Sequence, residues 1–355
     1  MAQALDLARL GQGAVAPNPL VGALLCDAQG KVLAQGFHRC FGGPHAEVEC
    51  LSAFAQVPPQ ATLFVTLEPC SHTGKTPPCV DLLLQKQVKQ VVVGQLDPNP
   101  LVAGQGVARL RQAGVEVLVG CREAECRELN RFFNFHITAQ RPWITFKTAI
   151  TLDGKIATQA GESQWITGEP ARAHGHEQRS LHQGIMVGKN TLLADNPRLT
   201  DRVSKLPCQP QPIVAASRFE VHPQLHLFSD SRPQFWLVKQ IHGEDEKRAL
   251  DYGIILLPTG GDLAAGLRLL YQRQIGSVLV EGGGKLAASL VKAGLVEELL
   301  IYLAPRLLGQ PTAPGWMGDL GLQALAETPW FNLKEQQPLG QDLLLRYQKA
   351  PCLPA

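Results

Sequence analysis

Two short segments decide the fold of this chain: Pro44-His45-Ala46-Glu47 and Glu68-Pro69-Cys70-Ser71-His72-Thr73-Gly74-Lys75-Thr76-Pro77-Pro78-Cys79. A catalytic zinc ion takes three protein ligands and leaves one position open for water. His45, Cys70 and Cys79 supply one imidazole and two thiolates, which is such a set. The metal lowers the pKa of its bound water toward ~7, so hydroxide is available at neutral pH. The segments therefore predict one catalytic zinc ion per chain.

Glu47 follows the histidine ligand by two residues, near the start of a helix expected over 46–55. At that spacing the carboxylate lies near the metal without binding it. It can take a proton from the water and pass it to a departing amine. An H-x-E segment followed by P-C-x-x-C is the signature of zinc deaminases. This chain departs from the signature, because the loop SHTGKTPP separates Cys70 from Cys79.

Three other interpretations stay open at this point. A structural zinc site would be closed and four-coordinate, with Cys50 or His72 as the fourth ligand. A nucleic-acid deaminase, such as a tRNA adenosine deaminase with an appended domain, would need a basic surface. A zinc-stabilised scaffold without activity would have no use for a carboxylate at Glu47. Tight binding to a stem-loop RNA, or a water on the zinc, would separate these classes.

The pattern along the chain predicts two α/β domains. Strand-like runs at 21–27, 61–69, 90–97 and 114–120 alternate with helix-like runs, and 121–139 reads as a polar helix. Arg141-Pro142 stops that helix, because the residue before proline disfavours the helical region. Alternation of strands and helices then resumes and continues to the end. We therefore expect one domain over 1–140 and a second over 141–355.

Composition excludes several classes of protein. The 355 residues are 45% hydrophobic and 18% charged, with a net charge of +2, so no broad surface for nucleic acid is indicated. No apolar run reaches the ~18 residues of a membrane span. The N-terminus has no basic leader before an apolar block, and the 9 cysteines are irregularly spaced. We expect a cytoplasmic protein with a small-molecule substrate and no nucleic-acid or membrane partner, and we expect a homo-oligomer.

The two zinc segments, with APNPLVG at 16–22 and DPNP at 97–100, resemble the bifunctional riboflavin-biosynthesis deaminase–reductases. The resemblance covers nearly the whole chain. It implies a cytidine-deaminase-like three-layer domain followed by a dihydrofolate-reductase-like αβ domain. It also implies zinc-dependent deamination of 2,5-diamino-6-(5-phosphoribosylamino)pyrimidin-4(3H)-one. NADPH would then reduce the ribosyl group of the aminouracil product to ribityl.

Five residues are candidates for contacts with the substrate of the deaminase. His72, Lys75 and Thr76 place donors beside the metal, where an ammonium and hydroxyl groups suit a ribose 5′-phosphate. Asn18 offers a donor and an acceptor to the edge of a pyrimidinone, and His38 could reach the ribose. The alternatives are a solvated loop lysine, a turn residue before proline, and a histidine satisfied by the fold.

The second domain contains a strand, three glycines and a helix over 277–294. Glycines let the backbone approach a ligand closely, and a helix N-terminus favours a phosphate. The segment lacks the G-x-G-x-x-G spacing, and an ordinary turn at a helix start explains it equally well. Together with 147–157, 161–167 and 190–200 it resembles the reductase of the same family.

That resemblance implies two sets of residues by matching position. The NADPH site would be lined by Ala149, Trp165, Thr191, Asp195, Ser217, Gly283, Gly284, Lys285, Leu286, Ala287, Ala288 and Ser289. The phosphorylated ribosylaminopyrimidine would be held by Ser163, Arg179, Leu199, Arg202 and Glu281. The arginines suit a phosphate and Glu281 suits the amino groups of the pyrimidine. Trp165 in a core and Arg179 on a helix surface are the alternatives. Ala216 stands where the family usually carries Asp.

Overall fold

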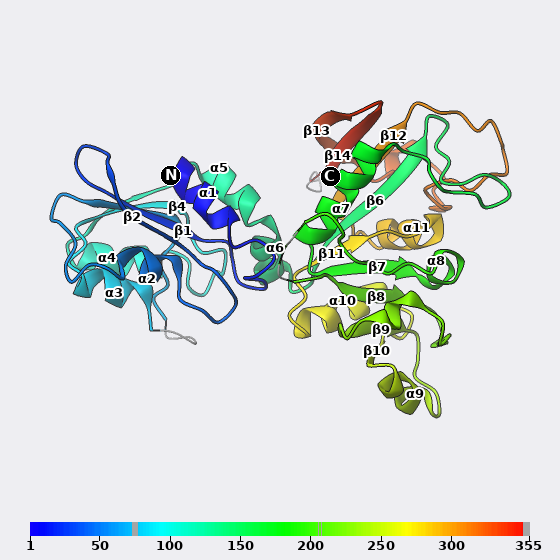
Figure 1. The fold of residues 1–355 in the computed structure, drawn as a ribbon, viewed down its shortest axis with the longest axis horizontal. Helices are drawn as coiled ribbons and strands as arrows, with labels where there is room; N and C mark the ends of the chain where they lie inside the picture. The colour runs from blue at the N-terminus through cyan, green and yellow to red at the C-terminus, as the bar shows by residue number, and fades with distance from the viewer. Residues whose placement is uncertain (73–76, 205, 207, 351–355) are drawn as a thin grey trace. The chain divides into compact units, whose positions relative to one another are not determined.

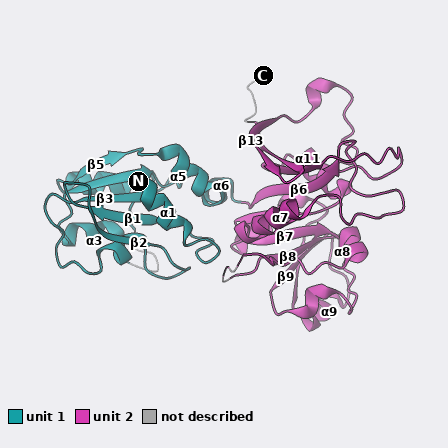
Figure 2. Ribbon diagram, turned by 45° about the horizontal axis from the view of Figure 1, so that its top comes forward, with its two compact units in different colours: residues 1–140 teal, residues 141–355 magenta. Residues whose placement is uncertain are grey.

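The computed structural model describes residues 1–72, 77–204, 206 and 208–350. The chain divides into two compact units, Met1–Gln140 and Arg141–Ala355. Figure 2 shows them in separate colours, and each is described by itself. Among the described residues, no helix has the length and apolar character that a membrane crossing requires.

Unit 1 (Met1–Gln140) is a five-stranded sheet in the order β2-β1-β3-β4-β5 with helices on both faces (Figure 1). Its strands are β1 (Gly22–Cys26), β2 (Val32–Phe37), β3 (Thr62–Leu67), β4 (Gln90–Gln95) and β5 (Glu116–Val119). Its helices are α1 (Ala2–Arg9), α2 (Ala46–Leu51), α3 (Cys79–Gln85), α4 (Gln105–Gln112), α5 (Glu123–Leu129) and α6 (Arg131–Ala139). β1 is antiparallel to β2 and β3, and β3, β4 and β5 are parallel.

The alternation of side chains along β1 separates the two faces of this sheet. Ala23 and Leu25 pack into the main core with residues of α2, α3 and α4. Leu24 and Cys26 point the other way, toward α1. Because both faces of the sheet are covered, β1 is fully buried and reads as a continuous apolar run. The result is the three-layer arrangement expected from the sequence.

Two predicted helices differ from the observed ones. The helix expected over 46–55 ends at Leu51. The helix expected over 121–139 breaks at Asn130, whose side chain accepts a hydrogen bond from the backbone N–H of Leu20 (2.8 Å) and donates to its carbonyl (2.9 Å). The long-range contact decides the backbone at Asn130, so helical periodicity alone could not predict the break.

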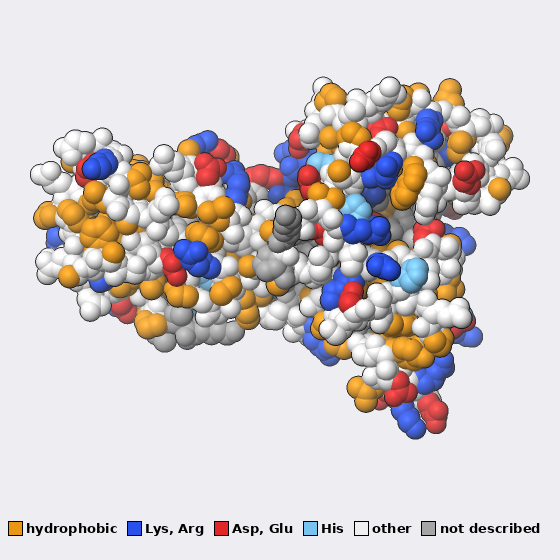
Figure 3. All heavy atoms as spheres, viewed as in Figure 1, with side chains coloured by type: hydrophobic (Ala, Val, Ile, Leu, Met, Phe, Trp, Pro, Cys, Tyr) orange, Lys and Arg blue, Asp and Glu red, His pale blue; other side chains and the backbone are white. Residues whose placement is uncertain are grey.

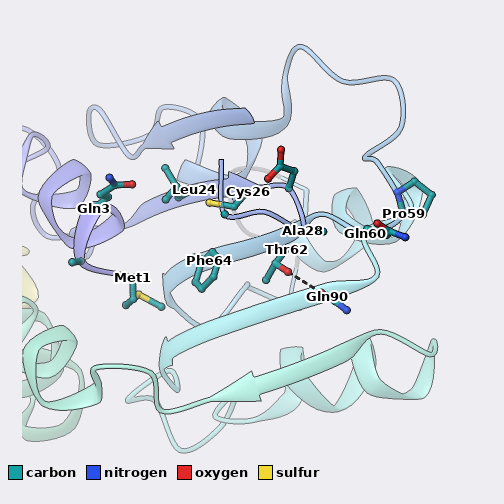
Figure 4. A pocket seen from close by; sticks show the side chains of 13 residues that line it. Met1, Gln3, Leu24, Cys26, Ala28, Pro59, Gln60, Thr62, Phe64 and Gln90 are labelled. Carbon is teal, nitrogen blue, oxygen red and sulfur yellow. Dashed lines mark hydrogen bonds between the residues drawn. The ribbon is translucent and has the colours of Figure 1, made fainter. Parts of the chain in front are cut away.

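An open hollow of about 780 Å³ lies on the α1 face of unit 1 (Figure 4). Leu24, Cys26 and Phe64 form an apolar part of its wall, and Thr62 donates a hydrogen bond to Gln90 (2.8 Å) beside them. None of the site residues predicted from the sequence lines it. The hollow is therefore on the opposite face of the sheet from α2 and α3, which carry the zinc segments.

Unit 2 (Arg141–Ala355) has a nine-stranded sheet in the order β10-β9-β8-β7-β11-β6-β12-β14-β13. Its strands are β6 (Trp143–Thr151), β7 (Gly184–Gly188), β8 (Gln211–Ala215), β9 (Gln234–Val238), β10 (Ile254–Pro258), β11 (Ser277–Val280), β12 (Glu298–Ala304), β13 (Phe331–Leu339) and β14 (Asp342–Lys349). Its helices are α7 (Glu169–Leu181), α8 (Lys189–Asp195), α9 (Asp245–Asp251), α10 (Leu263–Gln272) and α11 (Gly284–Lys292), with short 3₁₀ turns η1 (His226–Ser229) and η2 (Leu325–Glu327).

The two faces of the larger sheet differ in chemistry. Ile144 and Phe146 of β6 pack with residues of α10 and α11 in the largest apolar core of this unit. Thr145 and Lys147, which alternate with them, lie on the face that α7 covers. The parallel register places Val280 beside Phe146, so the strand end after β11 lies next to Lys147. Polar residues can therefore gather under α7, away from the apolar core.

Arg141 anchors the start of unit 2. Its Nη1 and Nη2 atoms donate to the two carboxylate oxygens of Glu297 at 3.0 and 2.6 Å, and the backbone N–H of Ile144 donates to the same carboxylate (2.9 Å). Burial raises the pKa of Glu297, and the Arg141 charge opposes that shift. The pair gains little over its desolvation cost, but removing one member is expensive because the other stays buried.

We predict that Glu297→Ala lowers the free energy of unfolding of unit 2 by about 3 kcal/mol, because the Arg141 charge and the Ile144 N–H lose their carboxylate. All 5 tryptophans lie in residues 141–355, so tryptophan fluorescence during urea unfolding reports on this unit. Glu335→Ala is the matched control, since that carboxylate is 47% exposed and 3.9 Å from Arg346. Equal effects of the two changes would contradict the anchoring role.

Candidate active sites

The three predicted zinc ligands meet at the starts of two helices. His45 is the residue before α2, Cys79 is the first residue of α3, and Cys70 follows β3. His45 Nδ1 lies 3.2 Å from Cys79 Sγ and 3.6 Å from Cys70 Sγ, and all three ligand atoms lie within 4.8 Å of one another. This donor set fits a zinc ion with three protein ligands.

The local electrostatics favour a thiolate at this point. The hydrogen bond between the two cysteine side chains lowers the pKa of the Cys70 thiol and raises that of Cys79, and the hydrogen bond to His45 further favours the Cys70 thiolate. The backbone N–H of Cys79 also donates to Cys70 Sγ (3.3 Å). Zinc binds cysteine as the thiolate, so these contacts prepare the sulfur for a metal.

Neither alternative fourth ligand belongs to this group. Cys50 lies in the apolar core of unit 1, where burial raises the pKa of its thiol to about 12. His72 is exposed and is absent from the set of mutually close ligand atoms in the described part of the chain. The described residues thus offer three ligand atoms, which is the number that a catalytic zinc site takes from the protein.

Glu47 is buried beside the ligand group, in the first turn of α2. Burial raises the pKa of its carboxyl group, and the neighbouring His45 charge opposes that shift. A raised pKa makes a carboxylate a stronger proton acceptor, as a general base requires. From this position Glu47 could give a proton to, or take one from, a water or substrate atom that lies beside the three predicted ligands.

Asn18 and His38, two candidate substrate contacts, lie together next to the ligand His45. His38 Nδ1 faces the carbonyl of Pro44 at 2.9 Å, so Nδ1 carries the proton and donates. Nε2 then accepts from Asn18 Nδ2 at 3.1 Å, which fixes the orientation of the Asn18 amide. The His38 ring lies 5.7 Å from the His45 ring, and burial lowers the pKa of His38. The structure brings these residues together, as a shared substrate pocket requires.

The remaining deaminase candidates are placed differently. Lys75 and Thr76 lie outside the described residues. His72 is exposed at the start of the inter-cysteine loop, and its charge lowers the pKa of the partly buried Asp97, against the larger effect of burial.

Sequence reasoning missed Glu68, which supports the ligand Cys70. Its buried carboxylate accepts from the backbone N–H groups of Asp97 (3.1 Å), Gly104 (2.9 Å) and Val107 (3.1 Å). It therefore ties the strand end that carries Cys70 to the loop before α4. An acidic residue at the end of a buried strand, two positions before a ligand, was the available signal.

A second group of charged residues lies under α7 in unit 2. Arg179 donates to both carboxylate oxygens of Glu281, through Nε at 2.9 Å and Nη2 at 2.7 Å, and through Nη1 to the carbonyl of Thr200 (2.8 Å). Burial alone would raise the pKa of Glu281, but the charges of Arg179 and Lys147 lower it to about 2. Glu281 is thus an ionised acceptor whose position Arg179 fixes.

Lys147 lies beside this pair. Its Nζ is 5.3 Å from the centre of the Tyr302 ring. Burial lowers the pKa of Lys147, against the attraction of Glu281. A Cβ at Gly175 of α7 would lie 3.5 Å from Lys147 Cε, an ordinary contact distance, so this helix packs directly over the Lys147 side chain. Figure 3 shows Lys, Arg and His side chains gathered on the face of unit 2 that carries α7.

The glycines of the 282–284 turn have separate roles. A Cβ at Gly284 would lie 2.9 Å from the carbonyl of Gly315, so this glycine is needed for packing against the 315–318 loop. A Cβ at Gly283 would meet only Thr191 Oγ1, at 4.0 Å. Gly283 and Thr191 therefore face each other across open space before α11, where a ligand could approach.

The other predicted cofactor residues fall into two groups. Ala287 and Ala288 are buried in the core, and Leu286 packs against it, so these side chains support α11 from within. The members with partly or fully exposed side chains are Ala149, Trp165, Asp195, Ser217, Lys285 and Ser289. Ala216, the departure from the family pattern, donates its N–H to the carbonyl of Leu237 (2.9 Å) at the end of β8.

The predicted substrate residues of unit 2 also differ in exposure. The Leu199 side chain is buried in the core, and its carbonyl accepts from Arg232 (2.9 Å). Arg202 is exposed, and Ser163 is partly exposed. The structure brings Arg179 and Glu281 into direct contact and leaves Leu199 only its backbone to offer a ligand.

The fold and the two sites define a class of protein: a zinc-dependent deaminase joined to a reductase. A family model for the cytidine and deoxycytidylate deaminase zinc-binding region matches residues 1–95, and one for the RibD C-terminal domain matches 142–345. The chain belongs to the RibD family of riboflavin biosynthesis proteins and is a bifunctional deaminase–reductase. The α/β fold class predicted from the sequence is confirmed.

Similar proteins cover the chain almost completely. RibD of Aquifex aeolicus is 38% identical over 98% of this chain and 97% of its own length, and RibD of Escherichia coli is 38% identical over 97% of each. The solved structure of Acinetobacter baumannii RibD has a TM-score of 0.89 at 34% identity, over 99% of this chain and 98% of that one. A Thermotoga maritima structure, described as a diaminohydroxyphosphoribosylaminopyrimidine deaminase/5-amino-6-(5-phosphoribosylamino)uracil reductase, has a TM-score of 0.86 at 32% identity, over 99% and 97%.

We predict that Cys79→Ser loses tightly bound zinc and destabilises unit 1, because metal binding free energy is partly folding free energy. Metal analysis after dialysis should find about one zinc per wild-type chain. Cys50→Ala is the matched control and should keep its zinc. If Cys79→Ser kept zinc while Cys50→Ala lost it, Cys50 would be the true ligand.

Proposed function

We propose that unit 1 deaminates 2,5-diamino-6-(5-phosphoribosylamino)pyrimidin-4(3H)-one and that unit 2 reduces the ribosyl group of the product with NADPH. The observation that carries the first half is the buried carboxylate of Glu47 beside three convergent ligand atoms. The deaminase and reductase activities by which the Thermotoga maritima relative is named support the choice of substrates.

In the deamination, His45, Cys70 and Cys79 would hold the zinc ion. When bound, zinc would supply an activated water molecule, whose oxygen forms a bond to the carbon that carries the amino group. Glu47 takes the proton of that water and gives it to the departing nitrogen, so the C–N bond breaks and ammonia leaves. One carboxyl group can serve both transfers, because it lies buried beside the ligand atoms, where burial raises its pKa and so favours proton uptake.

Asn18 and His38 orient the substrate of unit 1. The Asn18 amide is fixed by His38 and presents its remaining polar atoms to the edge of the pyrimidinone. His38 is held by Pro44 next to the ligand His45, in position for the ribose. Lys75 and Thr76, with His72, are assigned to the 5′-phosphate, since an ammonium beside hydroxyl donors binds that group well.

In unit 2, NADPH supplies a hydride when bound. The net reduction would place a hydride on C1 of the ribosyl group and break the bond from C1 to the ring oxygen, which would take up a proton. Gly283 and Thr191 would receive the cofactor at the start of α11, with Ala149, Trp165, Asp195 and Ser217 along the same site. Glu281 accepts hydrogen bonds from the amino groups of the pyrimidine, held by Arg179.

We predict that Glu47→Gln keeps zinc and fold but lowers the rate of ammonia release by at least ~10²-fold, the lower range for a general acid–base group. NADPH oxidation with the deaminated substrate should not change. Glu49→Gln on the same helix is the control, because Glu49 pairs with Arg39 at the surface (3.1 Å) and should keep deamination near wild type.

Near-normal ammonia release by zinc-loaded Glu47→Gln would refute the role of Glu47. Loss of zinc from that variant would instead show a structural part for the carboxylate. Measuring metal content and ammonia in the same samples separates the two results.

We also propose that the units work independently, with the division at 140. A fragment of residues 1–140 should deaminate without NADPH. A fragment of 141–355, which keeps the Arg141–Glu297 pair, should oxidise NADPH when given the deaminated ribosylaminouracil phosphate. Folded fragments that are inactive apart but active when mixed would contradict this division and require a site built from both units.

A further inference from the structure

His176 of α7 lies among the charged residues of unit 2 without a partner of its own within the described chain. It is three residues before Arg179, so the two side chains share one face of the helix. The charges that act on it are those of Arg179, Arg202, Asp201 and Glu281. Three of these four belong to the set assigned above to the substrate.

The other histidines of this segment are satisfied inside the fold. His174 Nδ1 bonds the hydroxyl of Tyr302 at 2.8 Å. His182 bonds the carbonyl of Gln178 through Nδ1 (2.8 Å) and the hydroxyl of Thr145 through Nε2 (2.9 Å). His176 has no hydrogen-bond partner for either ring nitrogen among the described residues, and of the two only Nδ1 is buried. Its Nε2 is therefore the nitrogen that a ligand can reach.

The burial of Nδ1 selects the tautomer of His176. A buried N–H without an acceptor is rarer and costlier than a buried lone pair, so the proton belongs on Nε2. Burial and the charges of Arg179 and Arg202 lower the pKa of His176, against Glu281 and Asp201, which keeps the ring neutral. The side chain thus presents an N–H donor that has no acceptor in the described chain.

The surroundings select the acceptor. The fork of Arg179 is occupied by Glu281, and the carboxylate of Asp201 accepts from the backbone of Val203 (3.0 Å) and Ser204 (3.1 Å). Arg202 is exposed and has no ion pair within the described residues. A free N–H next to an uncompensated guanidinium suits an anion with several acceptor oxygens, which is the chemistry of a phosphate monoester.

We infer that Nε2–H of His176, together with Arg202, holds the phosphate group of the substrate of the reductase. The inference rests on the proposed function of unit 2. His176 is a positioning residue: it acts on the phosphate, away from the carbon that receives the hydride. Arg179 then orients Glu281, and Arg202 binds the phosphate. The two arginines predicted from the sequence therefore have different roles.

The experiment uses the full chain with His176→Phe, which removes the donor, and His176→Gln, whose amide can donate from near the position of Nε2. Steady-state reduction is measured with the ribosylaminouracil phosphate and with the same compound lacking the phosphate, and NADPH affinity is measured by fluorescence. Glu177→Gln, an exposed neighbour on α7, is the matched control.

His176→Phe should raise KM for the phosphorylated substrate about 10- to 100-fold, as expected for a hydrogen bond to a charged group, with kcat and NADPH affinity nearly unchanged. The substrate without phosphate should show no change, and His176→Gln should recover most of the loss. The effects of His176→Phe and Arg202→Ala should be non-additive, because both act on one group.

Equal effects on the two substrates, or no effect on either, would overturn the inference. If His176→Phe does not fold, the comparison of His176→Gln with His176→Asn decides, since the shorter amide cannot reach the position of Nε2; similar KM values for both would count against the role. Failure of the proposed function looks different, because the wild-type chain would then not reduce the ribosyl group at all.

Discussion

The chemistry of unit 1 depends on bringing one imidazole and two sulfur atoms within 4.8 Å of one another at the starts of two helices. Two thiolates repel each other and all three groups lose hydration when crowded, so the fold must hold them together. It does so with a buried five-stranded sheet, with Glu68 bonded to three backbone N–H groups, and with Asn130 fixing the 16–22 segment. Glu47 gains its raised pKa from the same burial.

Unit 2 stabilises an ionised carboxylate with neighbouring positive charges. A carboxylate that must stay ionised inside a protein needs a partner, and Arg179 supplies two hydrogen bonds to Glu281. Lys147 adds a second positive charge, and α7 packs over its side chain at Gly175. Because two cations lower the pKa of Glu281 to about 2, it remains an acceptor across the physiological pH range. Burial therefore raises the pKa of Glu47, whereas two neighbouring cations lower the pKa of Glu281.

The position of a surface hollow is a poor guide to these sites. The hollow of about 780 Å³ in unit 1 lies on the α1 face of the sheet, while the zinc ligands lie on the face of α2 and α3. The glycine turn of unit 2 is similarly mixed, since Gly284 serves packing and only Gly283 faces open space. Convergent polar atoms with shifted pKa values locate the chemistry better than volume does.

The sequence by itself indicated the α/β class, which is confirmed, and predicted His45, Cys70 and Cys79 as zinc ligands with Glu47 beside them, because metal-ligand spacing and strand–helix alternation are local patterns. It also marked Asn18, His38, Arg179 and Glu281 as candidates, though only through resemblance or residue type. Tertiary structure alone decided that Asn18 bonds His38, that Arg179 is paired with Glu281, that Asn130 breaks a helix, and that neither ring nitrogen of His176 has a hydrogen-bond partner in the described chain. The physical reason is that sheet register and helix packing bring these residues together. The spacing of residues along the chain does not predict such contacts.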